Sequence, residues 1–170
     1  DNTKVLHDWA NASSILLANG NTAFQNKSDK PSGSSDDAFQ GGGAKENDAV
    51  PSIANSGVNN KTDLTNFLYA QETLNGKTYL YLGWIRSNSE GSATVDFEFN
   101  QSAVKSSNGV TPKRTNNDIL LTFDFGGSSI ELGLRLWIGN DVSGQWGPEV
   151  DLDAGGFAVG KTTFVGAISE

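Results

Sequence analysis

Hydrophobic and polar side chains alternate along several short segments from residue 63 onward. Successive side chains of a β-strand point to opposite faces, so this period of two predicts strands. The first two segments flank Asn75-Gly76, a dipeptide that favours the tight turn of a β-hairpin. No segment carries the period of a convincing long helix. The predicted strands span residues 64–73, 77–87, 92–101, 118–127, 129–140 and 161–168.

The alternation also predicts which faces are buried. Within 92–101, Val95 and Phe97 share one face of the strand, and Asp96 and Glu98 share the other. We expect the Phe and Leu faces to form the core and the polar faces to meet solvent or a ligand. Many short strands with turn signals between them favour an all-β fold, a jelly-roll or concanavalin-like β-sandwich.

The first third of the chain has a different character. Residues 19–60 are dominated by Gly, Ser, Asn, Asp, Lys and Pro and contain few apolar anchors. We expect a long irregular N-terminal loop region there, of the kind that is functional or tied down in compact domains. With no repeat and no second domain visible, residues 1–170 are predicted to form a single β-sandwich domain.

Composition narrows the class of protein. The net charge is −8 and the sequence pI is about 4.5, which disfavours nucleic acid and anionic membranes as partners, because both need clustered Lys and Arg. No apolar run is long enough to insert into a membrane. The absence of Cys excludes disulfides and thiolate metal sites. The absence of both Cys and Met, the oxidisable sulfur side chains, fits an extracellular protein.

Three segments match functional motifs only in part. The P-loop-like residues 155–162 precede a predicted strand where the phosphate-binding helix would have to begin. The segment 151–156 begins like a calcium loop, but Thr162 stands where that loop has its glutamate, so a turn with acidic residues is the favoured interpretation. His7 is the only histidine and has no nucleophile motif beside it in sequence. Nucleotide binding and hydrolysis by a catalytic triad are therefore disfavoured.

Asp96 and Glu98 are predicted to lie on one face of a strand, roughly 6–7 Å apart. Such a pair can serve a glycosidase, bind a hard cation or simply form a polar face. The stretch "TVDFEFN" is similar to the E-x-D-x-E strand of one jelly-roll glycoside hydrolase family, but Thr94 replaces the first glutamate of that motif. Hydrolysis along that route is therefore the alternative rather than the leading hypothesis.

An acidic, glycine-rich stretch, "SSDDAFQGGGAKEND", occupies residues 34–48. Ca²⁺ takes six to eight oxygen ligands, and glycines allow backbone carbonyls to turn toward it. A glycine-rich loop without a metal, braced through Lys45, is the competing interpretation. The predicted calcium ligands are Asp36, Asp37, Glu46, Asp48 and Asp63.

Four segments carry a resemblance to a known group of domains: "SDDAFQGGGAKENDAVP", "NNKTDLTNFLYA", "YLYLGWIRSNSEGSATVDFEFNQS" and "SNGVTPKRTNNDILLTFDF". In motif order they resemble an uncharacterised jelly-roll domain of large secreted or surface-anchored, adhesin-like bacterial proteins, although this chain has an extra glycine in the first motif. The resemblance covers roughly residues 9–160. It implies a jelly roll at the bacterial cell surface, excised from a larger surface protein, and it supplies no catalytic residues.

Tryptophans are the candidate platforms for a sugar ring, provided that they are exposed. Trp146 lies in the turn-rich "SGQWGPE" and is the best candidate for exposure, whereas Trp84 is more typical of a core. We therefore expect a non-enzymatic, extracellular adhesion or ligand-binding module, with a glycan or a cell-surface protein as partner. A glycoside hydrolase-like enzyme and a purely structural stalk domain are the alternatives. The predicted ligand-binding residues are Trp84, Arg86, Asp96, Glu98, Asn100 and Trp146.

Overall fold

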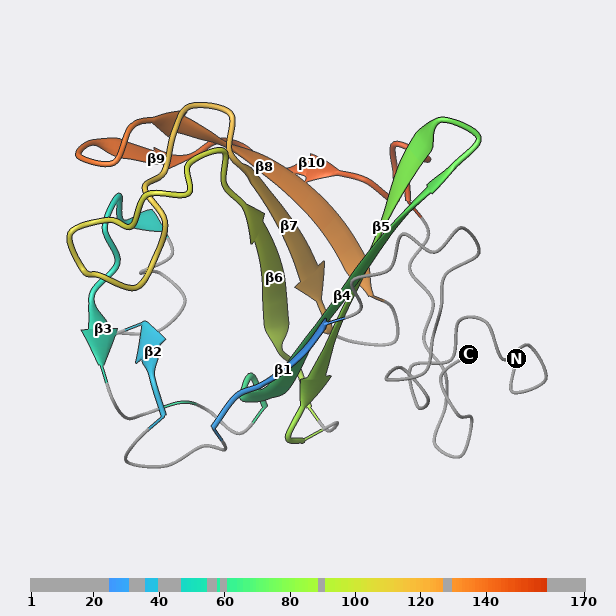
Figure 1. Ribbon diagram of the computed structural model, residues 1–170, viewed down its shortest axis with the longest axis horizontal. Coiled ribbons are helices and arrows are strands. Elements are labelled where there is room, and N and C mark those ends of the chain that lie inside the picture. Colours follow the sequence, from blue (N-terminus) through green and yellow to red (C-terminus); the bar gives the residue numbers. More distant parts are fainter. Residues whose placement is uncertain are drawn as a thin grey trace. The chain divides into compact units, whose positions relative to one another are not determined.

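A computed structural model of the chain describes residues 25–30, 36–39, 47–54, 58, 61–88, 91–126 and 130–158. These residues form β-strands in antiparallel sheets and no α-helix (Figure 1). The prediction of an all-β fold is therefore confirmed. Among the same residues, no helix is long and apolar enough to cross a membrane.

The chain divides into two compact units, which are described one at a time. The first unit comprises Asp1–Pro31, Asp63–Ser87 and Thr163–Glu170, and the second comprises Ser32–Thr62 and Asn88–Thr162. The single sandwich domain over residues 1–170 stays a prediction.

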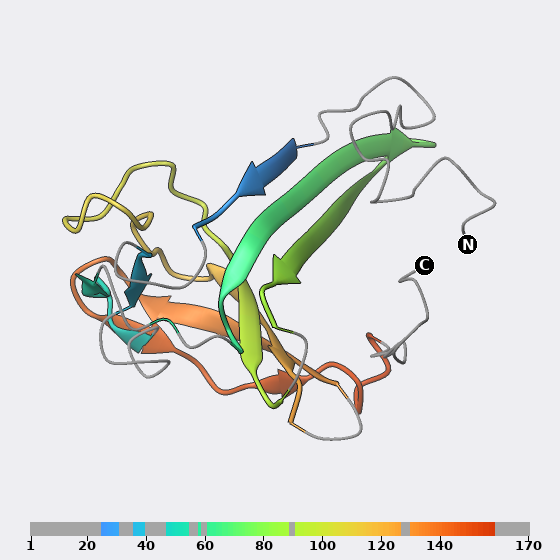
Figure 2. The same cartoon turned by 90° about the horizontal axis from the view of Figure 1, so that it is seen from below.

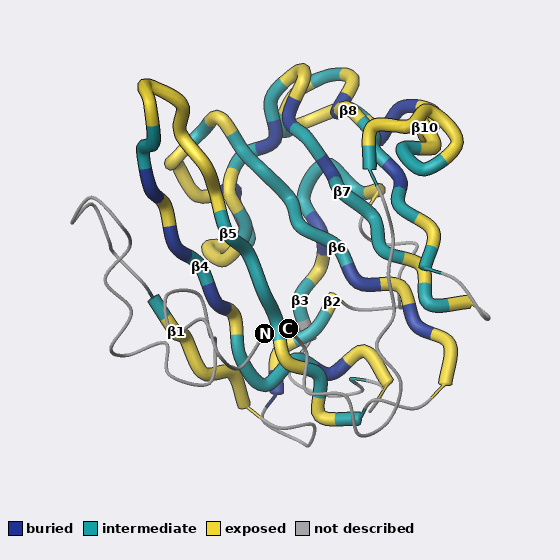
Figure 3. The backbone as a smooth tube through the Cα atoms, turned by 90° about the vertical axis from the view of Figure 1, so that its right-hand side faces the viewer, coloured by how far each residue is buried: buried dark blue, intermediate teal, exposed yellow. Residues whose placement is uncertain are grey.

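The first unit contains a three-stranded antiparallel sheet in the order β1-β4-β5 (Figure 2). Its strands are β1 (Gln25–Ser28), β4 (Leu64–Leu74) and β5 (Lys77–Arg86). The predicted hairpin is confirmed, with Asn75 at φ 52° and Gly76 at φ 75° between the two long strands. Figure 3 shows buried and exposed residues alternating along β4, as expected for a strand with one covered face.

The second unit contains a larger antiparallel sheet in the order β10-β8-β7-β6, with β9 paired to the C-terminal residues of β8, from Trp137 to Gly139. Beside it, β2 and β3 form a two-stranded sheet of their own. The strands are β2 (Ala38–Phe39), β3 (Ile53–Ala54), β6 (Thr94–Phe99), β7 (Ile119–Asp124), β8 (Glu131–Gly139), β9 (Gly144–Trp146) and β10 (Val150–Asp151).

The register of this sheet places the expected apolar side chains on one face. Val95 lies opposite Phe123 and Phe97 lies opposite Leu121, and the rings of Phe97 and Phe123 meet edge to face at 5.6 Å. Of these side chains only Val95 is fully buried, and the others are half-buried.

The opposite face departs from the expectation that polar faces meet solvent or a ligand. It carries the buried cluster of Leu120, Trp137 and Trp146, against which Ala49 packs. The prediction that this face meets solvent or a ligand is therefore wrong around Trp137, because the segment that contains Ala49, remote in sequence, packs against it.

The region expected to be irregular contains three short strands among its described residues: β1, β2 and β3. Each has at most four residues and is held by pairing to another strand rather than by its own hydrophobic pattern. The strand predicted over 161–168 lies outside the described residues.

Candidate functional site

A buried arginine is the centre of the second unit. Arg114 lies in the loop between β6 and β7, and its side chain is 1% exposed. Its Nε donates to Oε1 of Glu98 at 2.9 Å and its Nη2 donates to Oε2 at 2.7 Å, which makes a bidentate ion pair with β6. The paired geometry offsets the cost of removing the Arg114 charge from water, and the side chain of Glu98 stays 22% exposed.

Two indole rings cover the guanidinium of Arg114. Its Cζ lies 4.8 Å from the ring centre of Trp137 on β8 and 5.1 Å from that of Trp146 on β9. The two indoles pack edge to face, 5.1 Å apart and 78° between planes. A cation beside aromatic rings in a desolvated position is a favourable contact, so Arg114 joins the polar strand residue Glu98 to the aromatic cluster.

The same arginine also holds the end of the acidic stretch. Its Nη1 donates to the carbonyl of Asp48 at 2.6 Å. Pro51 lies three residues after Asp48, and its carbonyl accepts a hydrogen bond from Nδ2 of Asn108 at 2.8 Å. Two side chains of the β6–β7 loop thus hold this segment at Asp48 and at Pro51. Ala49, which lies between these two residues in sequence, packs against the aromatic cluster.

A buried carboxylate organises the other end of that loop. Asp118 accepts hydrogen bonds from the backbone amides of Thr115 at 2.7 Å and Gln101 at 3.0 Å, and from the side chain of Asn100 at 3.2 Å. Burial by itself raises the pKa of Asp118, but these hydrogen bonds outweigh it and the pKa is lowered from its usual 3.8. The folded protein therefore holds Asp118 as an anion.

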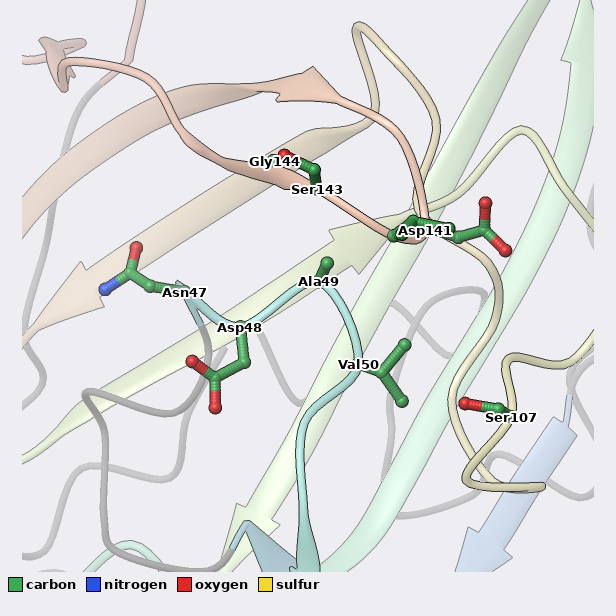
Figure 4. Close-up of a pocket in the computed structure, with 9 residues that line it drawn as sticks. Asn47, Asp48, Ala49, Val50, Ser107, Asp141, Ser143 and Gly144 are labelled. Atoms are coloured by element: carbon green, nitrogen blue, oxygen red, sulfur yellow. The ribbon is translucent and has the colours of Figure 1, made fainter.

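A hollow of about 580 Å³ opens between three segments of the second unit (Figure 4). One wall is the segment that Arg114 and Asn108 hold, and the facing wall is the turn between β8 and β9. Figure 4 shows Ala49 directed toward that turn. The lining residues are Asn47, Asp48, Ala49, Val50, Ser107, Asp141, Val142, Ser143 and Gly144.

The β8–β9 turn is itself fixed by hydrogen bonds. Oδ1 of Asn140 accepts from the amides of Val142 at 2.8 Å and Ser143 at 2.9 Å. Gly144 lies against the indole of Trp137, where a Cβ would approach the ring to 2.7 Å. This close approach requires glycine and connects the hollow wall to the buried cluster.

The two carboxylates that line the hollow do not converge. Figure 4 shows the side chains of Asp48 and Asp141 directed away from each other. Asp141 forms an ion pair with Lys113 at 2.7 Å, and the hydrogen bond from Lys113 lowers the pKa of Asp141. The arrangement therefore does not supply two facing carboxyl groups to one reacting atom.

The predicted ligand-binding residues fall into two groups. Trp84 and Arg86 lie on β5 of the first unit, and neither is fully exposed. In the second unit, Asp96 lies opposite Thr122 in the sheet register. The other three lie around the Arg114 network: Glu98, Asn100, which donates to Glu98 at 2.7 Å, and Trp146.

The expectation that Trp146 is exposed is wrong, because its side chain is 5% exposed. The register pairs it with Trp137, and the ring takes its place in the buried cluster instead of presenting a face to solvent.

The predicted calcium ligands are likewise divided between the units. Asp36, Asp37 and Asp48 belong to the second unit and Asp63 to the first, while Glu46 lies outside the described residues. Over the described ranges, no group of three His, Cys, Asp or Glu side chains comes together as a metal site. The calcium ion stays a prediction that rests on the sequence.

The acidic segment after β10 is a turn, as its missing calcium-loop glutamate predicted. Oδ1 of Asp151 accepts from the amide of Ala154, and Oδ2 of Asp153 accepts from the amide of Leu132, each at 2.8 Å. Both carboxylates therefore cap backbone amides.

Arg114, Asn108 and Asp118 are not among the functional residues predicted from the sequence. Arg114 and Asn108 lie in a polar loop without hydrophobic alternation, and Asp118 lies at the very start of a predicted strand. Arg114 binds a carbonyl 66 residues away along the chain. The pair Lys113-Arg114 in an acidic chain was the only local signal.

Comparison of the chain with models of protein families, with curated proteins and with solved structures finds no match in any of the three. The resemblance to surface domains of bacteria accordingly stays a prediction from the sequence motifs.

Proposed function

We propose that this chain is a non-enzymatic carbohydrate-binding module of an extracellular protein at the bacterial cell surface, and that the hollow of the second unit receives the sugar. The observation that carries the proposal is a hollow of about 580 Å³ that is lined by short polar side chains. Hydrogen bonds within the protein hold its walls in place. Its size lies within the roughly 300–1,000 Å³ of small-molecule sites.

The chemistry of the lining suits a sugar ring. Asn47, Ser107 and Ser143 offer amide and hydroxyl groups, which both donate and accept hydrogen bonds as sugar hydroxyls require. Ala49 and Val50 offer apolar surface for the C–H groups of a ring. Together with the carboxylates of Asp48 and Asp141 in the same lining, this combination favours a neutral carbohydrate over an anionic ligand.

The walls of the hollow are set before any ligand arrives. Arg114 and Asn108 hold the wall at 47–51, and Asn140 holds the facing turn. Binding then loses little free energy in ordering these segments. In this proposal Glu98, Asn100 and Trp146 contribute to binding by fixing Arg114 and the loop around it.

The alternative of a glycoside hydrolase has less support. A glycosidase of the usual kind needs two carboxyl groups flanking the scissile bond, one of them protonated as the acid. Glu98 is instead held in a bidentate ion pair with Arg114. The carboxylates at the hollow point apart.

The proposed architecture is a jelly-roll β-sandwich, for which the antiparallel sheets of both units are the support. A calcium ion at the acidic stretch belongs to the same proposal but is separable from the hollow. The glycan measurements are therefore made once with calcium and once with a chelator.

A glycan array with two matched variants tests the proposal. Ser107→Trp places a bulky ring in the mouth of the hollow, whereas Val104→Trp adds the same ring on the same loop at an exposed position outside the lining. We expect the wild type and Val104→Trp to bind the same neutral glycans and Ser107→Trp to lose them. Equal binding by both variants contradicts the assigned site, and binding of no glycan by the wild type contradicts the function.

A further inference from the structure

The chain contains the dipeptide Asn-Gly three times, and two of these lie in the described part of the chain, at Asn75-Gly76 and Asn108-Gly109. Asparagine is thermolabile, and glycine after it leaves the next backbone amide unhindered. The two sites share the Asn-Gly dipeptide but lie in different surroundings in the structure, so their reactivity can be compared from those surroundings.

The reaction in question needs only the chain and water. The backbone nitrogen after the asparagine attacks the side-chain carbonyl carbon and forms a five-membered succinimide. The side-chain nitrogen leaves as ammonia and carries away the proton of the attacking amide. Water then opens the ring at either carbonyl, which gives aspartate or isoaspartate.

Asn108 is held against this reaction by its whole side chain. Its Oδ1 accepts from the amides of Val110 at 2.8 Å and Thr111 at 3.0 Å. Its Nδ2 donates to the carbonyl of Pro51 at 2.8 Å and to Oγ1 of Thr111 at 2.9 Å. The attacking amide, that of Gly109, donates to the carbonyl of Ser106 at 3.0 Å.

Asn75 has none of these restraints. It is exposed in the turn between β4 and β5, and over the described ranges no hydrogen bond holds its side chain or the amide of Gly76. A Cβ at Gly76 would meet no atom within 4 Å, so the space around the attacking amide is open.

This end of the hairpin is also its least supported part. Among the described strands, β1 pairs only with residues Asn66 to Tyr69 of β4, so the last pairs before the turn belong to a two-stranded ribbon. Two-stranded ends open locally at low free energy. Such opening lets the Asn75 side chain reach the geometry of attack.

We infer that Asn75 is a site of spontaneous deamidation in the folded protein and that Asn108 is protected from it. Aspartate at position 75 adds a negative charge beside Lys77 and tolerates the positive φ. Isoaspartate lengthens the main chain by one atom within a two-residue turn, so it disturbs the register of the hairpin.

Peptide mapping by mass spectrometry tests the inference. The whole protein is kept at mildly alkaline pH and body temperature, once folded and once in guanidinium chloride, and digested at intervals. Conversion of an amide to a carboxylic acid increases the mass of a peptide. In the folded protein we expect this increase to occur at least ~10-fold faster in the Asn75 peptide than in the Asn108 peptide. In denaturant the two sites should convert at similar rates.

Two variants make the comparison specific. Asn75→Gln should abolish the change at the hairpin, and Thr111→Val, which removes one partner of the Asn108 side chain, should accelerate conversion at Asn108 alone. Equal rates at the two sites in the folded protein, or no conversion of Asn75 while the denatured chain reacts, would overturn the inference.

Discussion

Arg114 is a single cation on which several parts of the second unit depend. It pairs with a strand carboxylate, packs on two indoles and binds a backbone carbonyl of a segment 66 residues away. Removing it leaves Glu98 without its ion-pair partner and opens a space beside the aromatic cluster.

We therefore expect Arg114→Met to lower the free energy of unfolding by about 3–5 kcal/mol, the usual effect of removing one partner of a buried ion pair. Chemical denaturation measures this change. Arg135→Met is the matched control, because the side chains of the Arg135–Glu149 pair are 34% and 43% exposed and ion pairs at the surface contribute about 0–1 kcal/mol. Similar losses in both variants would show that the buried network has no special role.

Asp118 gives the protein a predictable response to acid. Because its pKa is lower in the folded state than the usual 3.8, the unfolded chain takes up a proton first as the pH falls. The stabilisation from Asp118 is present above about pH 4 and is lost as the pH drops through its folded pKa. In Asp118→Asn, thermal unfolding should depend less on pH below about 4 than in the wild type. If the thermal stability of Asp118→Asn fell with pH below about 4 as steeply as that of the wild type, the lowered pKa of Asp118 would be contradicted.

At the scale of elements, the β8–β9 turn depends on one close approach. A methyl group at Gly144 would lie 2.7 Å from the buried Trp137 ring, so Gly144→Ala must displace either the indole or the turn. We expect a loss of about 1–3 kcal/mol in the free energy of unfolding, as for overpacked cores. Ser143→Ala, one residue earlier and exposed, should change stability by less than about 0.5 kcal/mol.

The long strands were predictable because their own side chains determine them. Alternation and the Asn75-Gly76 turn located β4 and β5 closely, and alternation alone located β6, β7 and β8. The short strands β1, β2 and β3 were not predictable, because each exists only through pairing with a remote partner. Burial of Trp146 was missed for the same reason, since its cover comes from Arg114 and the register with Trp137.

The candidate site was predictable only in part. Glu98 and Asn100 were selected as functional side chains. The sequence does not reveal that Glu98 pairs with an arginine 16 residues further on, or that Asn100 donates to that glutamate. The walls of the hollow come from segments around residues 47, 107 and 142, and only folding brings those segments together.

For the whole molecule, net charge sets a limit on ligands. With 20 acidic and 12 basic side chains, the protein repels anions at long range. We expect neutral glycans to bind and sulfated glycans and DNA to be bound weakly, with the difference greatest at low salt because added ions screen the repulsion. An array read at two salt concentrations checks this, and a preference for sulfated glycans at low salt would contradict it.

The edge-to-face contact of Trp137 and Trp146 also has an optical consequence. Two indoles with centres 5.1 Å apart and planes at 78° are close enough for their electronic transitions to couple. Such coupling splits the far-ultraviolet circular dichroism of the indoles into a pair of bands of opposite sign. Trp137→Phe removes that couplet, so the wild-type signal reports the packing around Arg114 without any attached label.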